Sequence, residues 1–191
     1  MKQALLGTSL LLMVTRAPAA ELEGVDLEDR IQVDDQELQL NGIALRTRLF
    51  FKVYVGGLYF GRKVSTPQDA LDTKGAKRIV FVMMREAGAE QFVESIDEGL
   101  RDNHTPEELA RVMHQTEALF AMIRNVGRAG KGTRIVLDYV PSAGGTTLFV
   151  DGMAQGKPMA GEDFYRALLR IWLGDRPAQE RLKRALLGQP H

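Results

Sequence analysis

The segment LQLNGIALRTRLFFKVYVGGLYF, from Leu38 to Phe60, is the longest stretch of this 191-residue chain that is dense in β-branched, aromatic and aliphatic residues. Such residues favour the pleated surface of a strand. Successive side chains of a strand point to opposite faces, so the odd positions from 45 to 59 form a core-like face. The even positions mix aromatic residues with the cations Arg46, Arg48 and Lys52. This mixed face either lines a cavity that holds an anion or is solvated, with the side-chain stems lying along the surface.

Hydrophobic periodicity predicts short strands before this segment and alternating blocks of strands and helices after it. Asn41-Gly42 is typical of a hairpin turn, because both residues tolerate positive φ. Thr105-Pro106-Glu107-Glu108 is typical of a helix start. The expected strands are 31–33, 37–40, the long segment, 78–84, 134–140 and 146–150. One helical turn is expected at residues 67–72, and longer helices are expected from Ala89, after the Thr105 cap, and over 163–173 and 177–187. Tight turns imply antiparallel pairing, so the sequence predicts an α+β fold with helices packed on one face of a twisted sheet.

The first twenty residues predict a secretory signal peptide. Lys2 precedes a short apolar run, and Ala17-Pro18-Ala19 is a small-residue cleavage site. The run is too short to span a bilayer, and no other segment approaches the necessary length. We therefore expect a leader over residues 1–20, a single domain over residues 21–191, and export, with the periplasm as the expected location and no embedding in a membrane.

Charge and composition exclude several classes of protein. The chain has 25 basic and 25 acidic residues, and removal of residues 1–20 takes away only Lys2 and Arg16, which leaves a net charge of about −2. A nucleic-acid binder needs a concentrated basic surface, which the sequence does not indicate. The absence of cysteine excludes disulfides and thiolate chemistry.

No catalytic or metal-binding motif is evident, so we expect no metal, no cofactor and no catalytic residue. The histidines, His104, His114 and His191, lack the spacing of a zinc site. The segment GRAGKG, residues 127–132, resembles a phosphate loop only superficially. It lacks the P-loop spacing and a hydroxyl residue directly after Lys131, and it precedes a strand instead of a helix.

The segment from Asn41 to Phe60 resembles the N-terminal signature of chalcone isomerase-like proteins. Its matching features are Gly42, Arg46, Lys52, Tyr54 and the run Gly56-Gly57-Leu58-Tyr59. The segment EDFYRALLRIWLGDRP, residues 162–177, is similar to the C-terminal helix of the bacterial, exported branch of that family. The resemblance implies an open-faced β-sandwich with a ligand cleft between an antiparallel sheet and a helical layer.

The resemblance also implies which residues bind a ligand. Family isomerases use an arginine and a threonine to close a chalcone into a flavanone, whereas fatty-acid-binding relatives carry a tyrosine in place of the threonine. Arg46 and Tyr54 match the binding pair. The tyrosine and asparagine of the isomerase helix align with Phe92 and Gly99, and the usual serine or threonine of the C-terminal helix aligns with Tyr165, which is much larger. These departures favour binding over catalysis.

The expected apolar part of this site consists of Phe50, Met84, Phe92 and Met113. Arg46 and Tyr54 are eight residues apart, about 26 Å on one straight strand. They can share a ligand only if the chain reverses between them; otherwise Lys52 or Arg48 replaces one of them.

Three hypotheses follow. The first is an exported, non-enzymatic protein that binds a small amphipathic acid such as a fatty acid. The second is an intramolecular lyase of the chalcone isomerase type. The third is a periplasmic interaction module whose charged strand face, with Arg48 and Lys52, docks a protein.

Overall fold

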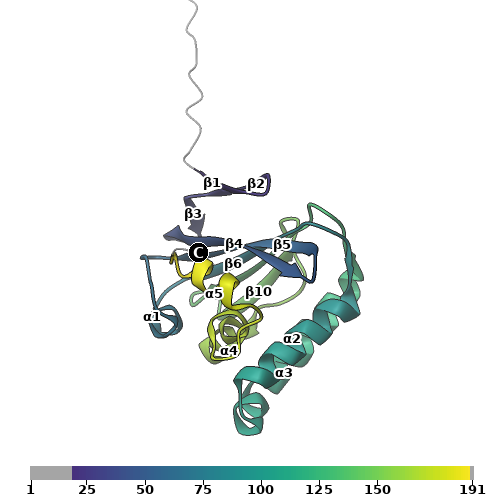
Figure 1. Ribbon diagram of the computed structural model, residues 1–191. Helices are drawn as coiled ribbons and strands as arrows, with labels where there is room; N and C mark the ends of the chain where they lie inside the picture. Colours follow the sequence, from purple (N-terminus) through teal and green to yellow (C-terminus); the bar gives the residue numbers. More distant parts are fainter. Residues whose placement is uncertain (1–18, 190–191) are drawn as a thin grey trace, which may run out of the picture.

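A computed structural model describes residues 19–189 of the chain (Figure 1). The strands are β1 (Ala19–Leu22), β2 (Val25–Glu28), β3 (Arg30–Val33), β4 (Gln36–Arg48), β5 (Phe51–Phe60), β6 (Lys77–Met83), β7 (Ala87–Gly88), β8 (Arg128–Ala129), β9 (Arg134–Val140), β10 (Gly145–Val150), β11 (Met153–Ala154) and β12 (Met159–Ala160). The helices are α1 (Pro67–Asp72), α2 (Ala89–Asn103), α3 (Pro106–Val126), α4 (Glu162–Leu173) and α5 (Glu180–Leu186). The predicted leader lies outside these residues except for Ala19 and Ala20, which begin β1.

The main sheet is antiparallel and has the strand order β11-β10-β9-β6-β5-β4-β3, with β12 also paired to β10. Figure 1 shows helices α2 to α5 on one side of it and the separate β1–β2 hairpin on the other. The larger hydrophobic core lies between the sheet and the helices, and a smaller one lies under the β1–β2 hairpin. The predicted α+β fold, an antiparallel sheet with helices on one face, is confirmed.

The long segment is a hairpin, so the prediction of one continuous strand was wrong. The chain reverses at Leu49 and Phe50, between β4 and β5. The hairpin predicted at Asn41-Gly42 is also absent, because β4 runs straight through both residues with only a shift in register beside Gly42. A β-carbon at position 42 would lie 2.7 Å from the carbonyl oxygen of Leu186, and nearer still to that of Ala185. Gly42 is therefore needed for the close approach of α5 to β4.

Local signals explain the helices. The Thr105 side chain accepts a hydrogen bond from the Glu108 backbone, and the Glu108 side chain accepts one from the Thr105 backbone, which is a capping box. The predicted helical turn at residues 67–72 is α1, capped by Thr66. The last helix begins at Glu180 and not at the expected Pro177.

Candidate ligand-binding site

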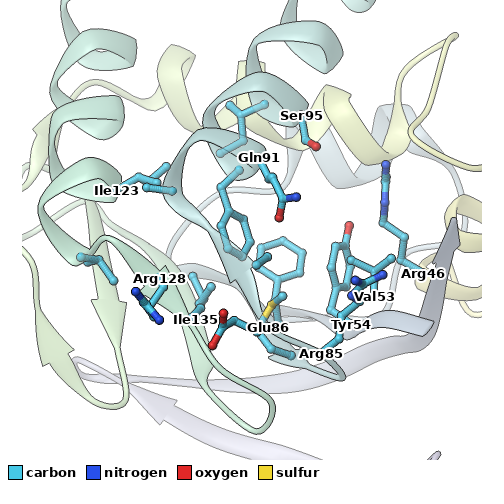
Figure 2. Close-up of a pocket in the computed structure, with 18 of the residues that line it drawn as sticks. Arg46, Val53, Tyr54, Arg85, Glu86, Gln91, Ser95, Ile123, Arg128 and Ile135 are labelled. Atoms are coloured by element: carbon cyan, nitrogen blue, oxygen red, sulfur yellow. The ribbon is translucent and has the colours of Figure 1, made fainter. Parts of the chain in front are cut away.

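A cavity of about 260 Å³ lies between the sheet and helices α2, α3 and α4, at the end of the sheet where β4 turns into β5 (Figure 2). Its interior is apolar. Among the residues that line it are Phe81, Met83, Phe92, Leu119, Leu137, Leu148, Leu168, Ile171 and Trp172. The charged and polar residues of its lining are Arg46, Arg48, Tyr54, Arg85, Glu86, Gln91, Ser95 and Arg128. An apolar interior with a few polar groups is typical of a small-molecule site.

Arg46 and Tyr54 meet because the hairpin brings them face to face. They are directly paired across β4 and β5, and the guanidinium carbon of Arg46 lies 5.9 Å from the centre of the Tyr54 ring. Figure 2 shows both side chains extending from the sheet toward the cavity. The reversal that the resemblance required is the turn at Leu49 and Phe50. The two residues can therefore contact one ligand.

The Tyr54 hydroxyl is oriented by Trp172, whose indole nitrogen lies 2.8 Å from it. An indole N–H can only donate, so the tyrosine oxygen accepts this bond and keeps its own proton available for an acceptor in the cavity. Burial raises the pKa of Tyr54 above its ordinary value of 10.0, while the charge of Arg46 and the bond from Trp172 act in the opposite direction. Tyr54 is therefore a neutral hydrogen-bond donor at neutral pH.

Helix α2 contributes two polar side chains on the opposite wall. Gln91 and Ser95 are one turn apart and line the cavity (Figure 2). The side-chain oxygen of Gln91 accepts a hydrogen bond of 3.3 Å from the backbone nitrogen of Gly88, at the start of the helix. Within residues 19–189 the amide N–H donors of Gln91 form no hydrogen bond, so they are available to a ligand.

The cations at the cavity lack carboxylate partners. Within residues 19–189, Arg46, Arg48, Arg85 and Arg128 form no ion pair, and Glu86 is the only acid in the lining. The guanidinium of Arg85 lies 4.9 Å from the centre of the Phe51 ring, a cation–π contact. The site therefore combines an excess of positive charge with an apolar interior.

The structure places three of the predicted site residues at this cavity, namely Arg46, Tyr54 and Phe92. Phe50 and Lys52 were misplaced because the sequence was read as one strand. Phe50 occupies the turn and is 98% exposed, and the exposed Lys52 forms an ion pair with Glu23.

Met84, Met113 and Tyr165 also lie outside the cavity lining. Met84 follows the last residue of β6. Met113 is 57% exposed and borders a separate groove between α2 and α3. Tyr165 is fully buried, and its hydroxyl lies 3.4 Å from the carbonyl oxygen of Leu137. Tyr165 fills the core beneath α4.

Sequence reasoning did not select Gln91, Ser95, Arg85, Arg128 or Trp172. Trp172 lies in the helix predicted over 163–173, and the spacing within α4 carries no information on a partner in β5. Arg85 follows the end of β6 and Arg128 begins β8, so only the folded chain brings both arginines to the cavity.

Within residues 19–189, no group of three or more histidine, aspartate or glutamate side chains is arranged to hold a metal ion. The described helices are also too short or too polar to cross a bilayer.

Comparison with known proteins identifies the family. The family model for chalcone isomerase-like proteins matches residues 19–188. The chain belongs to the chalcone isomerase-like family. A search of curated proteins gives no match. Among solved structures, the chain is similar to a fatty-acid binding protein of Arabidopsis thaliana, AtFAP1, with a TM-score of 0.67 and 13% identity over 89% of this chain and 96% of that one. At this identity the likeness shows a shared chalcone isomerase-like fold.

Proposed function

We propose that this chalcone isomerase-like chain binds a small amphipathic carboxylate, such as a fatty acid, without catalysing a reaction on it. The observation that carries the proposal is the apolar cavity beside arginines that have no ion-pair partner within residues 19–189. An arginine offers a permanent charge and forked donors that match a carboxylate. A neutral apolar ligand would leave these donors unused.

The geometry supports one orientation of the ligand. The carboxylate would accept hydrogen bonds from Arg46 and from the free proton of Tyr54, while the Gln91 amide lies on the facing wall. The hydrocarbon tail would lie along the apolar interior toward Leu119 and Leu168. The cavity, at about 260 Å³, is slightly below the roughly 300–1,000 Å³ range of drug-sized sites, which favours a single-chain ligand.

Two further observations support the proposal. The structurally similar AtFAP1 is named as a fatty-acid binding protein. The positions expected to carry the polar groups of an isomerase do not supply them here: Phe92 is apolar, and a β-carbon at Gly99 would lie 2.6 Å from Ile171. We expect no acceleration of ring closure of a 2′-hydroxychalcone beyond the spontaneous rate.

We also propose that the protein is exported to the periplasm, on the basis of the leader predicted from the sequence.

The test uses Trp172, the single tryptophan of the chain, as a reporter inside the site. Titration with a medium-chain fatty acid should change its emission, and native mass spectrometry should detect a ligand that co-purifies from cells. Arg46→Gln should weaken binding roughly tenfold or more, because charge-assisted hydrogen bonds are lost. Arg62→Gln is the matched control, since Arg62 is exposed and pairs with Asp69 away from the cavity.

Unchanged thermal unfolding of Arg46→Gln would show that the loss is one of binding. A purified protein that is empty and does not respond to fatty acids would overturn the proposal. Acceleration of chalcone closure, abolished in Arg46→Gln, would favour the intramolecular lyase instead.

A further inference from the structure

The turn between β4 and β5 exposes three consecutive large apolar side chains, Leu49, Phe50 and Phe51, which we call the apolar tip. Their exposed fractions are 85%, 98% and 57%. Leu49 has a φ of +55°, in the left-handed region that two-residue turns normally fill with glycine, asparagine or aspartate. A branched side chain there is strained. Exposed leucine and phenylalanine side chains lower solubility, and the turn does not require them. Their exposure therefore indicates that an apolar partner covers the tip.

The apolar tip is surrounded by cations that we call the basic edge: Arg48, Lys52, Arg85, Arg128, Lys131 and Arg134. All six are exposed. The strand register places them at one end of the main sheet, because Arg48 pairs with Phe51, Tyr54 with Met83, and Val82 with Arg134. Lys131 lies in the turn before β9, and Arg128 is in β8, which pairs with β7 just after β6.

Among the acids near this end of the sheet are Glu23, Glu86, Glu90 and Asp151. Glu23 pairs with Lys52, and Glu90 pairs with Arg124 of α3. Within residues 19–189 the other five cations of the basic edge form no ion pair, although the chain as a whole has 25 basic and 25 acidic residues. The cations are concentrated at the tip.

We infer that the apolar tip and the basic edge together dock this end of the sheet on an anionic lipid bilayer. Apolar side chains that enter the headgroup region gain hydrophobic free energy, and cations beside them attract anionic lipids, which is the pattern of peripheral membrane binding. No described helix needs to span the bilayer for this contact.

Docking would bring the mouth of the cavity against the lipid. Leu49, Phe51 and Arg85 belong both to this surface and to the cavity lining. An amphipathic acid partitions into a bilayer with its headgroup at the interface, so the cavity would open where such a ligand is found. Docking on lipid depends only on the apolar tip and the basic edge and does not require a ligand in the cavity. Membrane docking and acid binding can therefore each be wrong while the other holds.

The test labels the apolar tip. The chain contains no cysteine, so Phe50→Cys gives a single attachment site for an environment-sensitive dye such as NBD. With vesicles of equal parts phosphatidylglycerol and phosphatidylcholine, the dye emission should shift to the blue and increase. The same dye at Met113→Cys, an apolar position on α3 that is 57% exposed, is the control and should not respond.

Co-sedimentation with the same vesicles gives the second readout. Phe50→Ser should lower the partition coefficient roughly tenfold, because a phenylalanine no longer enters the lipid. Arg85→Gln should lower it roughly fivefold and reduce its dependence on salt. Met113→Ser should leave it unchanged. Residues 1–18 are identical in all variants, so any affinity that they add is the same throughout.

An equal response of the two labelled positions would overturn the inference, as would unchanged sedimentation of Phe50→Ser. Concentration-dependent dimerisation that Phe50→Ser abolishes, without a lipid-induced shift, would show instead that a second copy of the chain covers the tip.

Discussion

At the scale of single residues, the proposed binding site contains few hydrogen-bonding groups, and the orientation of each is set by its neighbours. Tyr54 accepts from Trp172 and can donate to a ligand, so one hydroxyl connects the sheet, helix α4 and the cavity. Arg46 brings the charge, and its place opposite Tyr54 follows from pairing between two strands. The resemblance at the sequence level could select these two residues, which both line the cavity, because both lie in one continuous motif. Trp172 could not be selected, since its partner is 118 residues away.

Removal of the Tyr54 hydroxyl should therefore weaken acid binding. We expect Tyr54→Phe to raise the dissociation constant of a fatty acid roughly fivefold to tenfold in isothermal titration calorimetry, because one donor to the carboxylate is lost. Since burial raises the pKa of Tyr54 above 10.0, this contribution should be constant from neutral pH to about pH 9.

The control for this substitution is Trp172→Phe, which breaks the same internal hydrogen bond but keeps the hydroxyl. Because Trp172 orients this hydroxyl and also lines the cavity, Trp172→Phe should weaken binding too, but less than Tyr54→Phe, which removes the donor itself. If Tyr54→Phe binds as tightly as the parent protein, the hydroxyl does not contact the ligand.

At the scale of elements, the sequence was most informative where a pattern is local. The capping box at Thr105 and the 3.6-residue spacing of α4 define their helices without help from the rest of the chain. The turn of the central hairpin was missed because Leu49 and Phe50 are not turn-forming residues, and the Asn41-Gly42 dipeptide was misread because its glycine serves a distant helix. In both cases tertiary structure overrides local propensity.

The fit of α5 on β4 gives a prediction at this scale. Gly42→Ala should lower the free energy of unfolding in urea by about 2 kcal/mol or more, since the added methyl group meets the backbone of Ala185 and Leu186 and neither can rotate away. Amides of α5 should then exchange faster with solvent. Gly61→Ala is the control, because open space surrounds that position and its stability should change little. Equal stability of both variants would mean that α5 does not need this close contact.

At the scale of the whole molecule, the two ends of the sheet carry different features. One end carries the cavity, the apolar tip and the basic edge. Toward the other end, the sheet is joined to the helical layer by Lys77 of β6, which is completely buried, and Glu162, the first residue of α4. Their side chains lie 2.6 Å apart, and the ammonium of Lys77 also lies 4.8 Å from the centre of the Tyr139 ring. A charge buried in this way is tolerated only while it is paired.

The pH dependence of stability follows from this pair. Burial raises the pKa of Glu162, but the hydrogen bond and charge of Lys77, with a contribution from Lys74, outweigh it and hold the pKa below the ordinary 4.5. Since the folded pKa is lower than the unfolded one, the stabilisation is fully present above about pH 4.5 and is lost as the pH falls through the folded value. Burial lowers the pKa of Lys77, so a partner is needed to keep it charged.

Glu162→Gln should therefore lower the free energy of unfolding at pH 7 by about 2–3 kcal/mol, somewhat less than the loss of a completely buried partner, because a quarter of the Glu162 side chain is exposed. Urea unfolding at several pH values should show a smaller decline below pH 4.5 than in the parent protein. Glu117→Gln, at an exposed position on α3, should behave like the parent. Lys77→Met removes the buried charge together with its need for a partner, so it should lower the free energy of unfolding at pH 7 less than Glu162→Gln does. An equal or larger decrease in Lys77→Met would contradict a role for the buried charge.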